Sequence, residues 1–263
     1  MISHAAGAAA VVLAVIAITL LPFLPGGYDP VAGPASMTAR VFGFVGLVLV
    51  PCGLVWLGWP RRGPGIALLA AFVVVWAAVA FAAFSSAGYV LCAIVVALGV
   101  VLFARVRSAV RSAAPAAGTY AVIVPLAVFT LQLLLVPRAV EFSRDRAIRN
   151  AAPLVADIER HRASRGQYPV SMLAVWPDYK PGVIGIERYH YEASGDAYNV
   201  AFEQIARELP TREFVVYNPR DEQTFTSHAS VLLQFDPGRL QRARGYFAVR
   251  DTAHPHWKLF WFD

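Results

Sequence analysis

The first half of this sequence has almost no charged residues, and the whole chain has almost no lysine. Only 15% of the 263 residues are charged and 57% are hydrophobic, whereas soluble domains carry about 25% charged residues. Residues 1–137 contain six Arg and one Asp but no Lys and no Glu. This composition is not typical of a soluble domain, and it predicts helices that lie in a membrane.

Cysteine is also scarce, and a phosphate-binding loop is missing. The two cysteines, Cys52 and Cys92, lie in apolar stretches, and residues 138–263 contain none. The C-terminal part is therefore not a disulfide-stapled domain. The glycines at 26–27 and 63–65 are typical of loops beside apolar stretches and do not match a nucleotide-binding loop. We predict no cofactor.

The net charge of +6 belongs mostly to the apolar part. Residues 1–137 carry +5, from six Arg and one Asp, whereas residues 138–263 carry only +1, from 17 basic and 16 acidic residues. Nucleic-acid-binding surfaces concentrate Lys and Arg. The nearly neutral C-terminal part therefore argues against nucleic acid as a partner, and the lipid bilayer is the expected partner of the first part.

Five stretches are long and apolar enough to cross a bilayer, whose hydrocarbon core needs about 20 residues of helix. No Asp, Glu, Lys or Arg lies inside any of them, and this disfavours ion-coupled transport. The first stretch has no basic segment before it and is longer than the core of a signal peptide, so we expect a retained anchor. The predicted spans are 5–24, 41–59, 65–84, 87–104 and 118–137.

The arginines of the short loops predict the orientation. Loops 60–64 and 105–117 together hold five Arg, whereas loop 25–40 holds one. Because basic loops stay in the cytoplasm, we expect a cytoplasmic N-terminus and a periplasmic segment 138–263 in a bacterial inner membrane. The ratio of 21 Arg to 2 Lys is typical of a GC-rich bacterial genome. Four arginines after the last span would make the loop counts equal, but long translocated domains largely escape the rule.

Residues 138–263 predict an α+β domain. The spacing of one helix face is seen at Ile148, Ala151, Val155, Ile158 and Arg162, which recur three and four residues apart. Gly166 is the expected residue just after the helix. Pro153 is expected either to start a new helix or to kink a continuing one. Further on the period changes to two, and Ser194-Gly195-Asp196 predicts a hairpin turn. One long helix packed on a mostly antiparallel sheet is therefore expected, with strands at 189–193, 197–202, 213–217, 230–235, 245–249 and 257–262.

The order of these features matches a known pattern. An apolar span continues into an amphipathic helix, followed by Gly166-Gln167-Tyr168-Pro169, a short apolar turn and tyrosine-rich hairpin strands. This order resembles the type IV pilin-like family, and most of all the globular part of type II secretion pseudopilins. The resemblance covers about a fifth of the chain and implies the fold of the C-terminal domain but no catalytic residue. The residues that carry it are Ala156–Glu159, Gly166, Tyr168, Pro169, Leu173, Tyr189, Tyr191, Gly195, Tyr198 and Phe202.

Two sets of residues are candidates for a functional site. The first set is the aromatic residues of the predicted hairpin. Aromatic residues favour interfaces, although packing in the core is the other interpretation of these residues. His254 and His256, which alternation would place on one strand face, are the candidate metal site, with His228 or Asp263 as a further ligand. Pro255 lies between the pair, and a structural or surface role is the other interpretation. The candidate interaction residues of the hairpin are Tyr189, Tyr191, Tyr198 and Phe202.

Two classes of function follow from the sequence. The first is a polytopic inner-membrane protein that presents residues 138–263 to the periplasm for contact with an envelope or secretion protein. The second is a membrane-tethered ligand sensor or metal-dependent enzyme that uses His228, His254 and His256. We favour the first class, mainly because tyrosine-rich segments are typical of interfaces and also because no metal-binding motif accompanies the histidines.

Overall fold

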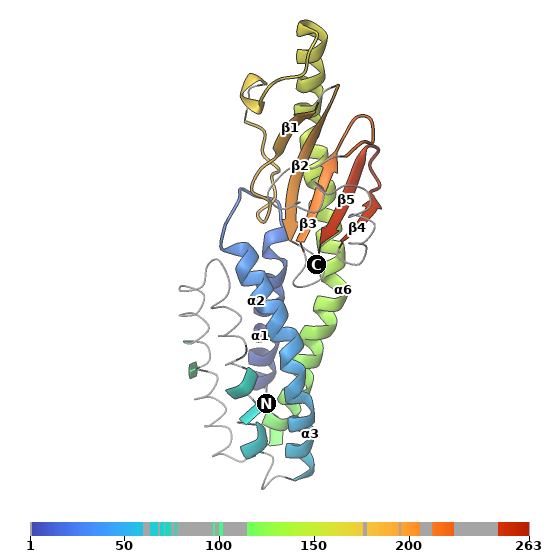
Figure 1. Cartoon of the computed structure of the whole chain (residues 1–263). Helices are drawn as coiled ribbons and strands as arrows, with labels where there is room; N and C mark the ends of the chain where they lie inside the picture. The colour runs from blue at the N-terminus through green and yellow to red at the C-terminus, as the bar shows by residue number, and fades with distance from the viewer. Residues whose placement is uncertain are drawn as a thin grey trace. The chain divides into compact units, whose positions relative to one another are not determined.

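The computed structural model describes two compact units (Figure 1). Unit 1 comprises Met1–Leu21 and Pro30–Arg138, and unit 2 comprises Pro22–Asp29 and Ala139–Asp263. The sequence predicted one boundary, after residue 137, and did not assign the first loop to the second unit. The residues left undescribed are 1, 60–63, 68, 71, 75–76, 78–96, 98–99, 102–114, 176–177, 195, 206–211, 224–246 and 263.

Unit 1 is built from long apolar helices. Helix α1 (Ile2–Leu20) ends in a 3-10 turn, η1 (Leu21–Phe23). Helix α6 (Pro115–Arg165) begins in the same unit. Between them, a continuous helical segment is formed by α2 (Ala32–Val45), the 3-10 turn η2 (Gly46–Val48) and α3 (Leu49–Gly58).

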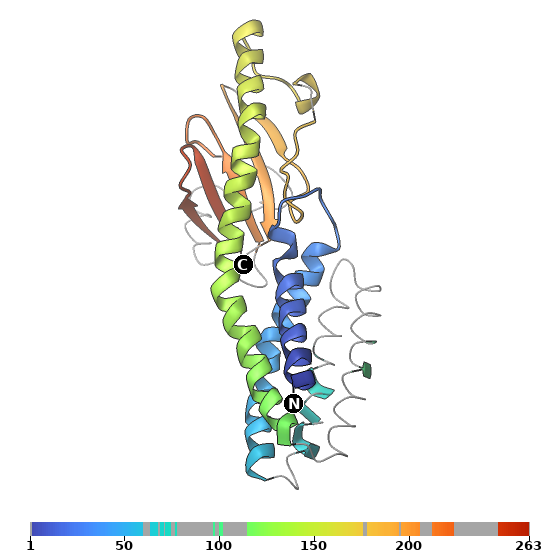
Figure 2. The same ribbon diagram turned by 180° about the vertical axis from the view of Figure 1, so that it is seen from behind.

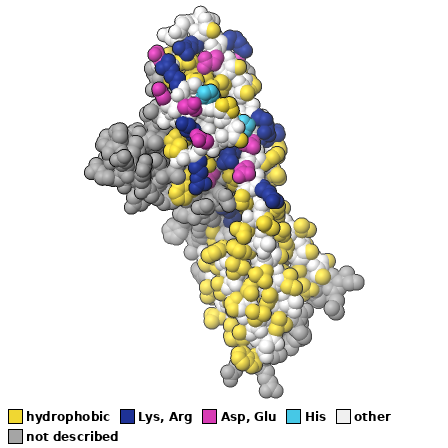
Figure 3. All heavy atoms as spheres, turned by 90° about the vertical axis from the view of Figure 1, so that its right-hand side faces the viewer, with side chains coloured by type: hydrophobic (Ala, Val, Ile, Leu, Met, Phe, Trp, Pro, Cys, Tyr) yellow, Lys and Arg dark blue, Asp and Glu magenta, His cyan; other side chains and the backbone are white. Residues whose placement is uncertain are grey.

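Three of these helical segments are long and apolar enough to cross a membrane, namely Ala5–Phe23, Ala32–Gly58 and Ala117–Arg165. They correspond to the first, second and fifth predicted spans. The sequence predicted five spans, and the other two, 65–84 and 87–104, lie largely outside the described residues. Hydrophobic side chains predominate on the face of unit 1 drawn in Figure 3, which is compatible with contact with lipid.

Several prolines lie within the helices without ending them. Pro51 is the third residue of α3, which follows η2. Pro125, Pro137 and Pro153 all lie inside α6, which continues past each of them. Pro153 therefore does not begin a separate helix.

A buried polar cluster joins three helices of unit 1. The Gln132 side-chain amide on α6 donates to the Thr19 hydroxyl on α1 and to the Ala39 carbonyl on α2, both at 2.9 Å. The Ser36 hydroxyl donates to the Thr19 carbonyl at 2.5 Å. Interhelical hydrogen bonds in membranes are worth about 0.6–2 kcal/mol each, so this cluster stabilises one register of the helices without a charged residue. Because Gln132, Thr19 and Ser36 are uncharged, the prediction from charged residues within the spans did not identify this cluster.

Helix α6 is a single helix of 51 residues whose second half belongs to unit 2 (Figures 1 and 2). Gly166 follows it with a φ of +76°, a conformation that glycine adopts without steric cost. Its N–H donates to the Arg162 carbonyl at 2.7 Å and closes the last turn. The predicted helix end at Gly166 is confirmed.

Unit 2 contains a five-stranded antiparallel sheet in the order β1-β2-β3-β5-β4. The predicted hairpin is confirmed, with Ser194 opposite Ala197 at its turn. The predicted strand at 230–235 lies outside the described residues. The strands are β1 (His190–Ser194), β2 (Ala197–Ile205), β3 (Arg212–Tyr217), β4 (Phe247–Asp251) and β5 (Trp257–Phe262).

The core of unit 2 lies between α6 and one face of this sheet (Figure 2). The predicted apolar face of the helix is buried, with Leu154 taking the fully buried place expected of Val155. Burying one large aliphatic or aromatic side chain contributes about 1.5–3 kcal/mol. The core positions on the helix and the three central strands are Ala147, Ile148, Ala151, Leu154, Ile158, Tyr198, Val200, Phe202, Val215, Trp257 and Leu259.

The second face of the sheet is also buried in its centre. Every residue from Ala197 to Phe202 in β2 is buried, whichever face it points to. Phe214 and Val216 of β3 and Phe260 of β5 are at most 4% exposed. Burial on both faces explains why the strand WKLFWF is apolar without alternation.

Candidate functional site

The aromatic residues predicted as an interaction surface lie mostly in the core of unit 2. Tyr189, Tyr198 and Phe202 are 3%, 0% and 0% exposed, and Tyr191 is half-buried. The Tyr189 hydroxyl donates to the Ala147 carbonyl on α6 at 2.6 Å, and the Tyr189 and Phe202 rings form a T-shaped pair with 6.1 Å between their centroids. In the folded unit these three side chains stabilise the packing of helix on sheet and are not accessible to a partner.

Tyr198 is the centre of a tyrosine cluster. The rings of Tyr168, Tyr191 and Tyr217 lie 4.8, 5.9 and 5.8 Å from its ring. Its hydroxyl is buried and has no hydrogen bond of normal geometry within the described residues. Burial raises the pKa of this hydroxyl far above its usual value, and the nearby Tyr217 and Glu159 raise it further. A buried polar atom without a hydrogen bond of normal geometry destabilises the folded state.

The Gly-Gln-Tyr-Pro segment, 166–169, is held firmly against the rest of unit 2. Arg162 donates to the Tyr168 hydroxyl at 2.5 Å, and its guanidinium carbon lies 4.5 Å from the centre of the same ring, within the range of a cation–π contact. The Tyr191 hydroxyl on β1 donates to the Pro169 carbonyl at 2.7 Å. This partly buried hydroxyl has a pKa raised to about 12, mainly because burial disfavours the phenolate.

The residues after this segment point away from the protein. Tyr168 and Pro169 are buried, but Val170 is 90% exposed and Leu173 is 82% exposed. Leu173 lies in the 3-10 turn η3 (Met172–Ala174). The exposed turn, which we define as Val170–Ala174, therefore displays two large apolar side chains on an anchored support. Leu173 is one of the residues that carry the pilin-like pattern, whereas Val170 is not, because in the sequence both residues belong to a short apolar turn without a distinguishing feature.

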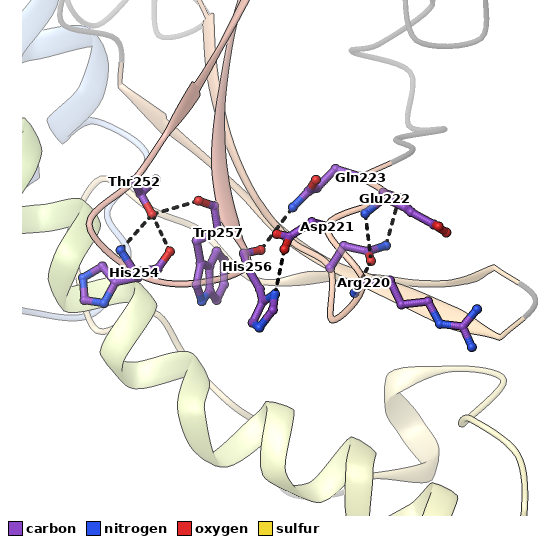
Figure 4. A network of polar contacts seen from close by, with 9 residues as sticks. Arg220, Asp221, Glu222, Gln223, Thr252, His254, His256 and Trp257 are labelled. Atoms are coloured by element: carbon purple, nitrogen blue, oxygen red, sulfur yellow. Dashed lines mark hydrogen bonds and ion pairs between the residues drawn. The ribbon is translucent and has the colours of Figure 1, made fainter.

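Two turns lie together at one end of the sheet, and the second of them contains His254 and His256 (Figure 4). Asn218 organises the first turn. Its side-chain amide donates to the Asn199 side-chain oxygen at 2.9 Å, and its own side-chain oxygen accepts the Arg220 N–H at 2.8 Å. The Asn218 N–H donates to the His256 carbonyl in the second turn at 3.1 Å. These bonds hold Asp221 and His256 at φ values of +59° and +65°, which are unusual for residues other than glycine.

In the described part of the chain, the side chains of the candidate metal ligands do not converge on one point. The His256 ring contacts Asp221 at 3.1 Å, whereas the His254 ring contacts Asp145 on α6 at 3.3 Å. Both histidines lie in the turn between β4 and β5 and not on a strand face as predicted, and His228 lies outside the described residues. Among the described residues, no group of three or more His, Cys, Asp or Glu side chains is arranged to hold a metal ion.

Comparisons with protein-family models, with curated proteins and with solved structures found no match for this chain. The resemblance to pilin-like proteins therefore stays a prediction that rests on the residues quoted above.

Proposed function

We propose that this protein is an integral membrane protein of a bacterial inner membrane that presents unit 2 to the periplasm for contact with a protein partner. The observation that carries the proposal is the exposed turn. Val170 and Leu173 are almost completely exposed, yet the neighbouring residues Tyr168 and Pro169 are fixed by hydrogen bonds to α6 and β1. A rigid support lowers the entropy that a contact costs on binding.

The membrane part of the proposal is supported by the three apolar helices and by their outward side chains. Leu13, Phe44 and Leu133 are 63–68% exposed, as expected of residues that face lipid. Helix α6 carries the chain from an apolar segment into unit 2 without a break. The periplasmic side is the one that the loop arginines favour.

The surface of unit 2 supports a protein partner better than nucleic acid. Acidic and basic side chains are interspersed on the face shown in Figure 3, without a continuous basic area. Nucleic-acid binding depends on clustered positive charge. The proposed partner is an envelope or secretion protein, in keeping with the pilin-like resemblance of this unit, and its contact is apolar at Val170 and Leu173.

Site-specific photo-crosslinking in native membranes tests this proposal. A photoreactive amino acid replaces Val170, Leu173 or, as a matched control, Val249, which is 45% exposed on β4. We expect one protein adduct shared by positions 170 and 173 and absent at 249. The V170D/L173D variant is expected to lose that partner while its melting temperature stays unchanged, because both side chains are already in water. Equal adducts at all three positions, or adducts with lipid only, would contradict the proposal.

A further inference from the structure

The first loop pairs through its backbone with a segment of the C-terminal unit. We call residues 22–29 the strap and residues 182–186 the docking segment. Pro25 and Val183 face each other in an antiparallel bridge. The hydrogen bonds are Ile184 N–H to Leu24 O at 3.0 Å, Gly26 N–H to Gly182 O at 3.1 Å, Gly185 N–H to Pro22 O at 2.7 Å and Asp29 N–H to Ile184 O at 2.9 Å.

The two segments approach closely at a glycine on each side. A Cβ atom on Gly26 would lie 2.8 Å from the Ile184 side chain, and one on Gly185 would lie 2.7 Å from Pro22 Cβ and 2.8 Å from its carbonyl oxygen. A contact below 3.0 Å requires a shift: the Ile184 side chain would have to move for Gly26, and the Pro22 backbone for Gly185. Gly27, in contrast, has nothing within 4 Å.

The docking segment is itself fixed to α6, and the pairing buries apolar groups. Asn150 donates to the Pro181 carbonyl at 2.6 Å and Arg146 to the Gly182 carbonyl at 3.0 Å. Phe23 of the strap is 3% exposed and Val183 is 1% exposed. The strap therefore satisfies backbone groups and covers apolar surface that residues 139–263 would otherwise leave open to water.

We infer that the strap is an obligatory part of the C-terminal unit, so that the first loop and residues 139–263 lie on the same side of the membrane. The chain leaves that side through α2 and α3 and returns through the first half of α6. It follows that Trp59 and the start of α6 lie on the side of the membrane opposite the strap, and that the N-terminus lies on that opposite side as well. This inference holds whether or not a partner binds at the exposed turn.

Disulfide trapping in the full-length protein tests the pairing. Cys52 and Cys92 are first replaced by Ala, and P25C and V183C are then introduced together. In a bridge of this type, without direct hydrogen bonds between the two residues, the Cα atoms lie about 4.5 Å apart, a separation that a disulfide spans. After mild oxidation of native membranes and denaturation, thiols are counted by the gel shift that a polyethylene-glycol maleimide produces.

We expect the P25C/V183C pair to lose both labels after oxidation and to regain them on reduction. The pair G27C/V183C, which is two residues out of register, is the control and should stay labelled. Labelling of both P25C and V183C at the control level would overturn the inference. As a second measurement, G26A should speed hydrogen exchange at the Ile184 and Gly185 amides by roughly tenfold, the loss expected for one or two backbone hydrogen bonds, whereas G27A should not.

Sidedness is tested with single cysteines and a maleimide that does not cross membranes. G27C in the strap and D196C in the hairpin turn are both exposed and should be labelled in the same type of sealed vesicle, right-side-out or inside-out. W59C, directly after α3 and 69% exposed at the native tryptophan, should be labelled only in the other type. Labelling of G27C and D196C from opposite sides, or of W59C together with G27C, would refute the inference.

Discussion

Replacing Tyr198 by Phe is expected to stabilise unit 2, although Tyr198 lies at the centre of its aromatic cluster. The hydroxyl is fully buried, and within the described residues its interactions with Glu159 and Tyr217 lack the geometry of a normal hydrogen bond. Leaving a buried polar group unpaired costs about 1–3 kcal/mol. The ring contacts with Tyr168, Tyr191 and Tyr217 do not depend on the hydroxyl. After allowance for the small cavity left behind, we expect the free energy of unfolding to rise by about 1 kcal/mol.

Tyr189 provides a matched control for this substitution, because the chemical change is the same and its predicted effect is opposite. Its hydroxyl donates to the Ala147 carbonyl at 2.6 Å. Y189F removes that bond, so the free energy of unfolding should fall by about 1 kcal/mol, the net contribution of one buried hydrogen bond. The two variants are therefore expected to differ by about 2 kcal/mol.

Thermal unfolding of the full-length protein in lipid nanodiscs, followed by tryptophan fluorescence, measures this difference. For a unit of this size, 1 kcal/mol shifts the melting temperature by roughly 3–6 °C. Hydrogen exchange at the β2 amides provides a second readout that reports on unit 2 alone. If Y198F melts at or below the temperature of Y189F, the Tyr198 hydroxyl has a partner and the reasoning is refuted.

Three further predictions concern other parts of the chain. In unit 1, G43A should lower the melting temperature in detergent, because a Cβ there would lie 1.9 Å from the Gln132 side-chain oxygen. The loss should be smaller in a Q132A background. If the effects of G43A and Q132A simply add, the contact between the two residues is contradicted. H254N/H256N should leave the metal content of the purified protein unchanged in elemental analysis, because the two rings contact different aspartates; stoichiometric metal lost in this variant would instead support the metal-dependent alternative. The pKa of Tyr191 is raised to about 12, mainly by burial, and an unfolded Tyr titrates near pH 10. The unfolded state therefore loses this proton first, so denaturant unfolding should show stability falling between about pH 10 and 12, and Y191F should reduce that fall; an unchanged slope would exclude Tyr191 as a cause.

Local patterns in the sequence predicted much of the fold of the described residues. The apolar spacing from Ile148 to Ile158 predicted the buried face of α6, and Gly166 predicted its end. Alternation and the turn Ser194-Gly195-Asp196 predicted the β1–β2 hairpin. Each of these features depends on residues within one or two turns or one hairpin, so neighbouring positions contain the necessary information.

The candidate site was less predictable, because residue type does not distinguish a core position from an interface. In the sequence, Tyr189 and Tyr198 look the same as tyrosines of a binding site. Only the packing of α6 on the sheet shows that they are buried. Val170 and Leu173 look like core residues in the sequence. The turn that follows Tyr168 and Pro169 places them in solvent instead.

By itself, the sequence determined the two kinds of unit in this protein: apolar helices suited to a bilayer and an α+β unit with a long helix. Bilayer thickness and backbone periodicity set those requirements residue by residue. Only the tertiary structure decided which distant residues meet. It brings Gln132 to Thr19 across 113 positions, and it brings Gly26 of the first loop to the docking segment at Gly182. Such contacts depend on how complete elements pack together, and no local preference of the chain specifies them.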